Sequence, residues 1–438
     1  MKDSTNRRRF LTAVGAGTFA LAGCSGQIPG GDDGDGDGNG NQSESGNDEG
    51  NETGNESGSG QSVPFPALDK GELVDDFENL EDWTPIEDGQ VAGDTENALV
   101  GSQSARIQGS GTFAGMFRAY PEGLNVANRN LSLALAVDAP RPARVTVELL
   151  APGESDMLRG TKTVVGTYTG WMRMDVGITG QRGEPNLENV QEMRIRLDAP
   201  EETDIRFWVD DLRATPKAEN GYVMLTFDDG VASQYENVFS RLNDRDMSGV
   251  VAVSSDSLNR EGRLNIDQLR EMRDAGWDVS SHPEGDAFQQ PLDDMEAIRS
   301  AIQSNYEYLD NRGFPNGARH MFVPYHNTNQ EIVEITREFH ELSSYFGGMP
   351  AAIPFTDPMH VSRVDMHNDG FTDLIDLAAE HNQLAVGLAH GVVPEDEIED
   401  DPLADMTVEQ LEELLDYIEQ SDVQVVTASQ LVDNQDSL

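Results

Sequence analysis

The sequence predicts a multidomain protein in which an antiparallel β-sandwich is followed by a domain of alternating strands and helices. Two patterns and one shift in composition support this prediction. Apolar residues alternate with period two in residues 64–216, and strand-like and helix-like runs alternate in residues 217–438. Residues 25–63 contain almost nothing that could be buried. A chain of 438 residues is also too long for one ordinary domain.

The N-terminal residues 1–24 are predicted to be an export signal. Arg7 and Arg8 belong to a stretch that resembles a twin-arginine signal, and a weakly apolar run of about thirteen residues follows, whereas a membrane span needs roughly twenty. The run ends at Cys24 in a sequence that resembles a lipobox. We therefore expect export by the twin-arginine route and a lipid anchor on Cys24, which would hold the protein on the outer face of the cell membrane.

Residues 25–63 are rich in Gly, Ser, Asn, Asp and Glu, so we expect a disordered acidic linker that separates the membrane anchor from the folded domains. Cys24 is the only cysteine of the chain, which excludes an intrachain disulfide and a metal site built from several thiolates of one chain.

The net charge of -50 and the pI of about 4.2 argue against a nucleic-acid partner, because phosphate binding needs basic surface. The acidity and the scarcity of lysine resemble proteins from salt-accumulating archaea. At molar salt the Debye length falls to about 3 Å, so a densely acidic surface repels itself little. We therefore expect a halophilic protein that loosens in dilute buffer.

The β-sandwich is predicted from short alternating runs with Gly, Pro and Asn between them and no convincing helix. The opening residues 74–77 and the closing residues 205–212 resemble the ends of a galactose-binding-like or carbohydrate-binding jelly roll. Its large aromatic side chains either stack on sugar rings or fill the core; they are Trp83, Trp171, Trp208 and Tyr120. Its paired aspartates either hold a structural calcium ion or are solvated; they are Asp75, Asp76, Asp210 and Asp211.

The C-terminal region shows repeated strand–helix units, which indicate a parallel sheet. Strand-like residues 249–254 precede helix-like residues 266–275, and residues 277–281 precede 292–309 in the same way. Thr407 and Gln410 form a possible capping box at the start of what we expect to be the last helix.

The most informative motif is a short apolar run that is followed by two adjacent carboxylates, Asp228 and Asp229, and by Gly230. The run reads as a strand that is covered on both faces. Gly230 would let the chain turn sharply after this strand. Charge at a strand tip indicates an active site, and the alternative is an acidic turn that arose by chance in an Asp-rich protein.

This motif resembles the first motif of the NodB-type polysaccharide deacetylases, carbohydrate esterase family 4, and further matches follow in the family's order. The second motif, His-Ser/Thr-x-x-His, corresponds to His282 and Asp286. The third, commonly Arg-Pro-Pro-Tyr-Gly, corresponds to a stretch with Tyr325 and His326, and the last, Leu-x-His, ends at His390. The resemblance covers residues 217–438 and implies a distorted (β/α) barrel with its chemistry at the C-terminal strand ends.

The resemblance also implies a mechanism and a divalent metal, zinc or another transition metal. By analogy Asp228 is the general base and His390 is the acid that protonates the departing amine. Asp229 and His282 bind the metal, and the backbone N–H near Tyr325 stabilises the oxyanion. Such an enzyme is a hydrolase that acts on carbon–nitrogen bonds other than peptide bonds.

Two departures from the family motifs bear on activity. Asp286 replaces the second histidine, and its carboxylate could still be the third ligand, for which His326 is a rival. Phe322 replaces the arginine that holds the base in the family, and Arg363 could substitute from another strand.

The function predicted from the sequence is removal of acetyl groups from N-acetylated or O-acetylated polysaccharide, at the cell surface or outside the cell, by an exported, lipid-anchored enzyme. Its predicted partners are the polysaccharide and the membrane. One rival is a surface glycan-binding protein with impaired catalysis, and another is a hydrolase of the same fold that acts on a non-sugar amide or an ester. The sequence does not identify the glycan, the metal or the oligomeric state.

Overall fold

The computed structural model describes residues 70–87, 89–368 and 370–434. The predicted export signal, the acidic linker and Cys24 lie outside the described residues. The described residues belong to one compact unit. No described helix has the length and apolarity that crossing a membrane requires.

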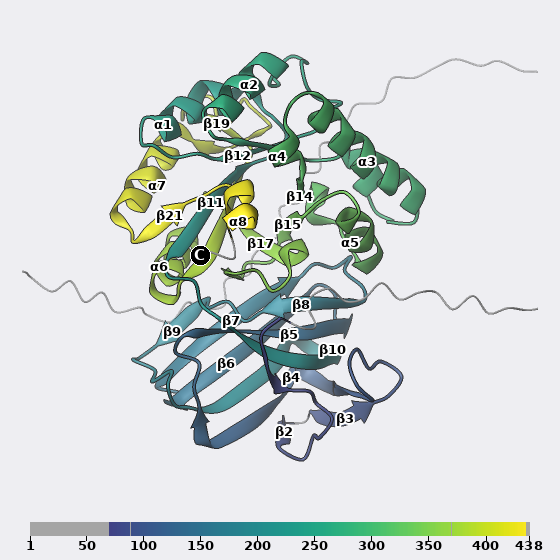
Figure 1. The fold of residues 1–438 in the computed structure, drawn as a ribbon. Coiled ribbons are helices and arrows are strands. Elements are labelled where there is room, and N and C mark those ends of the chain that lie inside the picture. The colour runs from purple at the N-terminus through teal and green to yellow at the C-terminus, as the bar shows by residue number, and fades with distance from the viewer. Residues whose placement is uncertain (1–69, 88, 369, 435–438) are drawn as a thin grey trace, which may run out of the picture. The chain divides into compact units, whose positions relative to one another are not determined.

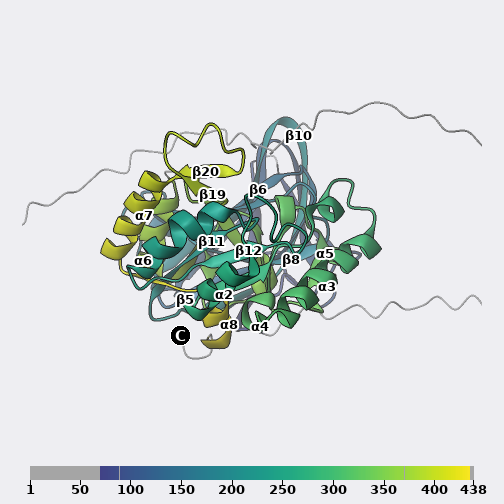
Figure 2. The ribbon, with the colours of Figure 1, turned by 90° about the horizontal axis from the view of Figure 1, so that it is seen from above.

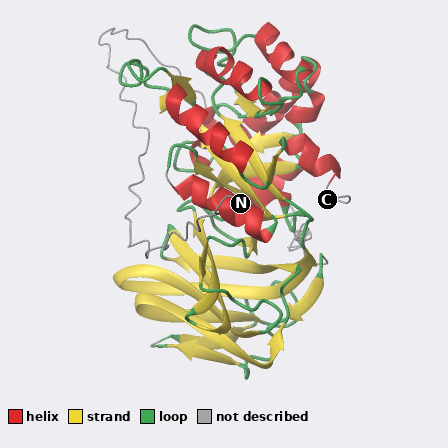
Figure 3. Cartoon of the chain, turned by 90° about the vertical axis from the view of Figure 1, so that its left-hand side faces the viewer, coloured by secondary structure: helices red, strands yellow, loops and turns green. Residues whose placement is uncertain are grey.

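Antiparallel strands make up the first part of this unit. Its described residues contain no helix, as Figure 3 shows. Their bounds are β1 Glu72–Asp75, β2 Trp83–Ile86, β3 Gln90–Asp94, β4 Ser104–Leu124, β5 Arg129–Ala139, β6 Ala143–Gly153, β7 Asp156–Val164, β8 Trp171–Asp175, β9 Gly180–Arg182 and β10 Val190–Pro216.

The two long strands β4 and β10 pair from Val190 to Val209 of β10 and join two groups of strands. The register shifts between Asp198 and Thr203 of β10. Before this shift β10 pairs with β6, and after it β10 pairs with β5. Apolar side chains of both groups pack into one cluster, as a sandwich requires. The opening strand β1 pairs with the end of β10; the jelly-roll connectivity stays a prediction.

A closed ring of seven parallel strands forms the second part, because β11 pairs with β12 on one side and with β18 on the other. Figure 2 shows helices around this ring. The ring strands are β11 Gly221–Phe227, β12 Val250–Val253, β13 Asp278–Ser281, β14 His320–Phe322, β15 Leu342–Phe346, β17 Val361–Asp365 and β18 Gln383–Ala389. The predicted parallel sheet is therefore confirmed, and it closes into a barrel. The other strands are β16 Ala351–Ala352, β19 Gly391–Val393, β20 Ala404–Thr407 and β21 Val423–Val425.

Helices connect the barrel strands (Figure 1). Their bounds are η1 Gln234–Phe239, α1 Ser240–Asn243, α2 Ile266–Asp274, η2 Gly285–Phe288, α3 Met295–Asn311, α4 Pro315–Ala318, η3 Pro324–His326, α5 Gln330–Arg337, η4 Pro358–His360, α6 Gly370–His381, α7 Val408–Gln420 and α8 Ala428–Asn434. The capping box of Thr407 and Gln410 is present at α7. The expectation that this helix is the last was wrong, because α8 follows it.

The antiparallel strands contact the barrel strand β17 through a buried lysine. Lys162 of β7 donates a hydrogen bond of 2.6 Å to Ser362 Oγ. Burial lowers the pKa of Lys162 to about 8, although the carboxylates of Asp175 and Asp357 oppose this effect. Ser362 directly precedes Arg363, so this contact supports the strand that presents Arg363.

Three of the four paired aspartates of the sandwich, Asp75, Asp210 and Asp211, are buried, contrary to one of the two expectations, whereas Asp76 is exposed. Asp75 accepts hydrogen bonds from Phe77 N and Trp83 Nε1, and Asp211 pairs with the buried Arg173. Asp210 accepts from the backbone of residues 99 and 100. Because these carboxylates already have hydrogen-bond donors, their geometry gives the predicted calcium ion no support.

Of the four aromatic side chains, Trp83 belongs to the core, and its ring packs at a tilt against Phe77. The other three are half-buried, and Trp208 donates its indole N–H to Asp94. Trp83 is therefore a core residue, whereas Trp171, Trp208 and Tyr120 lie nearer the surface.

Candidate active site

The site begins at the C-terminal end of β11, where a buried strand gives way to two acidic residues. All seven residues of β11 are buried, as the continuous apolar run predicted. The backbone N–H of Asp228 donates to the Ala389 carbonyl at 2.9 Å, which holds the end of β11 against the end of β18. Asp229 and Gly230 both have positive φ, 72° and 60°. The sharp turn expected at Gly230 therefore already starts at Asp229, a residue type that tolerates this conformation.

Asp228 is held by Arg363, which lies on β17. The guanidinium donates to both carboxylate oxygens, at 2.8 and 2.6 Å, and both side chains are buried. Burial alone would raise the pKa of Asp228, but the Arg363 charge outweighs it and the pKa lies below its ordinary value. Asp228 is therefore a carboxylate throughout the neutral range, and Arg363 is its hydrogen-bond partner.

Phe322 stands at the position of the arginine in the family's third motif, and it contacts two residues of the site. Its ring lies under Arg363, with the guanidinium carbon 5.2 Å from the ring centroid, a cation–π geometry. Its backbone carbonyl accepts a hydrogen bond of 2.7 Å from His282 Nδ1. The substitution has thus removed one charge from β14 without leaving Asp228 unpaired.

His282 and Asp229 face one another across the mouth of the barrel. His282 follows β13, and its Nε2 lies 3.4 Å from Asp229 Oδ1. Burial lowers the pKa of His282, but the negative charges of Asp228 and Asp229 outweigh burial and raise it. These carboxylates therefore favour a cation at this position.

A divalent metal fits these two donors. Two ligands that each lie about 2.1 Å from a tetrahedral metal are roughly 3.4 Å apart, which matches the observed separation. The Nδ1 hydrogen bond to Phe322 fixes the His282 tautomer that leaves Nε2 as the ligand atom. Asp229 and His282 would thus hold the metal.

The predicted third ligand is not assembled with these two. Asp286 lies on η2 with an exposed side chain, and it accepts a hydrogen bond from Gln289. Within the described ranges no group of three or more His, Cys, Asp and Glu could hold a metal ion. The rival, His326, is partly buried and accepts a hydrogen bond from Phe346 N through Nδ1. Burial, together with the nearby positive charge of Arg363, lowers the pKa of His326 to about 3.

His390 follows β18 and is paired with a carboxylate that the sequence analysis missed. Its Nδ1 lies 2.6 Å from Asp405 Oδ2, and its backbone N–H donates to the same carboxylate. Burial lowers the pKa of His390, but Asp405 and Asp228 outweigh burial and raise it to about 9. His390 is therefore protonated at neutral pH, the state that a proton donor needs. Asp405 stands on β20 with no local signal that points to His390.

Tyr325 lies on η3 at the rim of the site. Its side chain is 55% exposed and its φ is 52°. A Cβ atom added to Gly285 would lie only 2.9 Å from the Tyr325 hydroxyl, so the ring rests closely against this glycine. The predicted oxyanion role of the backbone near Tyr325 stays a prediction.

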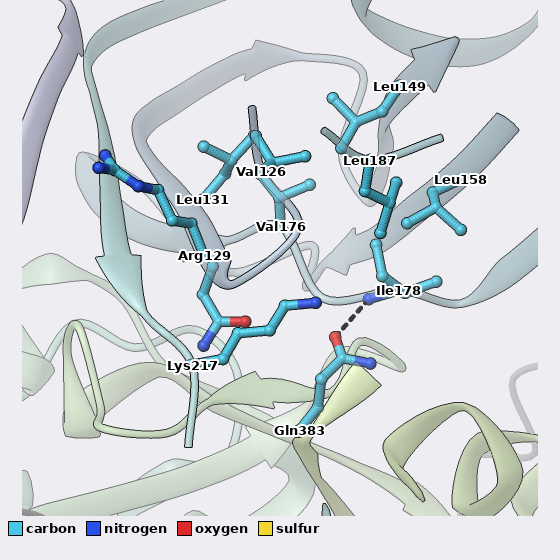
Figure 4. Close-up of a pocket in the computed structure, with 11 residues that line it drawn as sticks. Val126, Arg129, Leu131, Leu149, Leu158, Val176, Ile178, Leu187, Lys217 and Gln383 are labelled. Atoms are coloured by element: carbon cyan, nitrogen blue, oxygen red, sulfur yellow. Dashed lines mark hydrogen bonds between the residues drawn. The ribbon is translucent and has the colours of Figure 1, made fainter. Parts of the chain in front are cut away.

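A cavity elsewhere in the unit is not part of this site. Figure 4 shows Leu131, Leu149 and Lys217 around it, together with a hydrogen bond of 2.6 Å from Ile178 N to Gln383 Oε1. Gln383 begins β18, whereas His390 follows its end, and a strand of this length separates them by roughly 20 Å at about 3.3 Å per residue. The cavity therefore lies near the opposite end of β18 from the acidic and basic groups.

The comparisons with known proteins agree with the character of this site. Residues 215–340 match the family model for polysaccharide deacetylase. The match includes Asp228, Asp229, His282 and Tyr325, whereas Arg363 and His390 lie beyond it. Residues 215–340 are therefore similar to a polysaccharide deacetylase domain, and this match supports a hydrolytic deacetylase. No curated protein matches the chain in sequence.

Solved structures with some similarity fall into two kinds. The Xyl-CE4 domain of a multidomain xylanase from the hindgut metagenome of Trinervitermes trinervoides is 13% identical, with 50% of this chain and 92% of that one covered and a TM-score of 0.36. A family 4 carbohydrate esterase from Streptomyces lividans in complex with acetate is 17% identical, with 49% and 96% covered and a TM-score of 0.34. The family 11 carbohydrate-binding module of the cellulosomal cellulase Lic26A-Cel5E of Clostridium thermocellum is 15% identical, with 33% and 94% covered and a TM-score of 0.27. These TM-scores are too low to establish a shared fold.

Proposed function

We propose that this protein is a metal-dependent deacetylase that removes acetyl groups from an N-acetylated or O-acetylated polysaccharide. The observation that carries the proposal is the placement of a carboxylate and a protonated imidazole at adjacent strand ends. Asp228 follows β11 and His390 follows β18, and these two strands pair in parallel register. The metal-ligand pair of Asp229 and His282 lies beside Asp228.

In this proposal Asp228 accepts the proton of the attacking water. Its pKa lies below the ordinary value, so Asp228 is ionised at all working pH values but is a weak base. A divalent metal, when bound, lowers the pKa of a coordinated water and polarises the acetyl carbonyl, so a weak base suffices. Arg363 holds the Asp228 carboxylate in one orientation and limits its motion during proton transfer.

His390 supplies the second proton transfer. When the carbon–nitrogen bond of the tetrahedral intermediate breaks, the amine must leave with a proton, because an amide anion is a very poor leaving group. His390 is protonated at neutral pH, and Asp405 holds its Nδ1 so that Nε2 remains to donate. The products are free acetate and the amine of the sugar.

The proposed location and the proposed role of the antiparallel strands rest on the sequence. The N-terminal residues support export and attachment through Cys24, and the acidic composition supports a high-salt environment. We propose that the antiparallel strands hold the enzyme on its glycan, since Trp171 and Trp208 are only half-buried.

Acetate release tests the proposal. Protein purified in molar salt is incubated with a panel of N-acetylated and O-acetylated glycans, and with acetylated non-sugar amides and esters, in the presence of zinc or other divalent cations. We expect release from at least one glycan and only with a metal. Glycan binding without release would favour the binding protein, and release only from the non-sugar compounds would favour the other hydrolase.

A further inference from the structure

The candidate base and acid stand where the pairing between their strands ends. The pairing of β11 with β18 runs as far as Phe227 and Ala389, and one further backbone hydrogen bond joins Asp228 N to the Ala389 carbonyl. Beyond this point no backbone ladder between the two strands fixes the distance from Asp228 to His390. Side-chain groups can add to what holds the two residues at a constant separation.

Gln234, the first residue of η1, binds both residues through its side chain. Its side-chain Nε2 donates to the backbone carbonyl of Asp228 at 2.6 Å and to the backbone carbonyl of His390 at 3.0 Å. Gln234 is completely buried, so water does not compete for these bonds. The orientation of the amide is determined, because the flipped form would direct Oε1 at two carbonyl oxygens.

Neighbouring residues bind the same chain segment without contacting the base. Val392 N donates to Ser233 Oγ at 3.1 Å, and Asn237 Nδ2 donates to the Val392 carbonyl at 2.8 Å. These bonds fix β19 to η1. Only the Gln234 bonds join Asp228 and His390 to one group, so Asn237 provides a matched control.

The oxygen of the Gln234 amide indicates that a contribution to folding stability alone does not explain why a glutamine stands at this position. Gln234 Oε1 is buried and has no hydrogen-bond partner among the described residues. A buried acceptor without a partner is destabilising, and an apolar side chain of similar shape would avoid that loss. An apolar side chain could not donate the two hydrogen bonds that Gln234 Nε2 makes.

We propose that Gln234 is a positioning residue that sets the separation between Asp228 and His390 by binding both backbone carbonyls through one nitrogen. The inference rests on the proposed function, in which these two residues transfer protons to and from the same substrate. Misplacement of a catalytic group by about 1 Å can cost a hundredfold in rate, so loss of this link should reduce turnover with little effect on substrate binding.

The test compares Gln234→Met, which keeps the size of the side chain and removes both bonds, with Asn237→Leu. We expect Gln234→Met to lower kcat at least about tenfold with KM and metal content within about twofold of wild type. Asn237→Leu should keep kcat within about threefold. If Gln234→Met does not fold, Gln234→Asn serves instead, because its shorter amide cannot reach both carbonyls. Unchanged kcat in a folded Gln234 variant would overturn the proposal.

A double-mutant cycle separates positioning from a general loss of structure. In a His390→Ala background the acid is absent, so adding Gln234→Met should lower the residual rate by no more than about threefold. An undiminished tenfold effect in that background would show that Gln234 does not act through the base and acid.

Hydrogen exchange keeps the inference testable if the wild-type protein releases no acetate, an outcome that would refute the proposed function. Peptides that contain Asp228 and His390 should exchange faster in Gln234→Met than in Asn237→Leu, because only the first variant loses the link between them. Equal exchange in the two variants would overturn the role of Gln234 whatever the activity.

Discussion

Arg363 donates a hydrogen bond to each carboxylate oxygen of Asp228, although the two residues are 135 positions apart in the sequence. The pair is buried, and the Arg363 charge holds the pKa of Asp228 below its ordinary value. In the family motif the arginine stands at the position of Phe322. Here the guanidinium comes from β17 and lies over the Phe322 ring, so a positive charge reaches Asp228 from a different strand.

Arg363→Met should destabilise the protein and shift its pH profile. Removing one member of a buried ion pair leaves an unpaired charge, which typically costs about 3–5 kcal/mol. Without the guanidinium the pKa of Asp228 rises, so the base becomes protonated at higher pH and the acidic limb of the activity profile moves upward. Denaturant unfolding and a pH series of kcat/KM measure both effects. Arg363→Met combined with Asp228→Asn should recover part of the stability, and no recovery would contradict the pairing.

Asp405→Asn should move the alkaline limb of the profile to lower pH. Asp405 helps to raise the pKa of His390 to about 9, so wild-type activity should fall as pH rises through that value and the acid loses its proton. The asparagine removes the negative charge that stabilises the protonated ring, so that loss occurs at lower pH. Asp400→Asn removes the same charge from an exposed position of the loop between β19 and β20 and should leave the limb in place. An alkaline limb that stays in place in Asp405→Asn would refute the role of this residue.

Metal content should depend on Asp229 and His282. Elemental analysis after purification in molar salt should show loss of most of the metal in Asp229→Ala and His282→Ala, because each supplies one of two facing donor atoms. Equal metal in both variants and in wild type would disprove this assignment.

The third ligand is decided by a comparison of Asp286→Ala with His326→Ala. If Asp286 is the third metal ligand, as predicted from the sequence, its exposed carboxylate must leave Gln289 and turn toward His282. Metal binding should then weaken in Asp286→Ala and stay unchanged in His326→Ala, and Asp286→His should raise zinc affinity. The reverse pattern would assign the third ligand to His326.

Cys24→Ser should release the protein from the membrane into the medium, because the thiol is the proposed site of lipid attachment. Cell fractionation with immunoblotting measures the distribution, and an unaltered chain treated in parallel is the control. Membrane retention of Cys24→Ser would show that the lipid anchor is wrong.

Local sequence signals predicted many elements of the fold. The capping box at Thr407 and the apolar run of β11 both form as expected, since they depend on neighbours a few residues away. Closure of the barrel joins Tyr222 to Leu384, and no local periodicity encodes such a pairing. The prediction of a barrel therefore needed the family resemblance. Composition misled the reading of Asp210 and Asp211, which are buried.

The residues of the candidate site also divide into those that local motifs predicted and those that they did not. Asp228, Asp229, His282 and His390 could be named because each follows a strand in a short motif. Their supporting partners could not be found from the sequence, because a hydrogen bond between side chains on different strands leaves no local pattern. Asp405 and Gln234 were missed for this reason, and Arg363 was named only as a substitute from another strand.

Acetate release by Asp228→Asn, measured beside wild type at equal metal content on the same acetylated glycan in molar salt, tests the central claim most directly. The asparagine keeps the shape of the side chain and loses the ability to accept a proton, so the rate should fall by roughly two to four decades while the metal remains bound. Acetate release at the wild-type rate by the metal-loaded variant would show that Asp228 is not the base and would contradict the account.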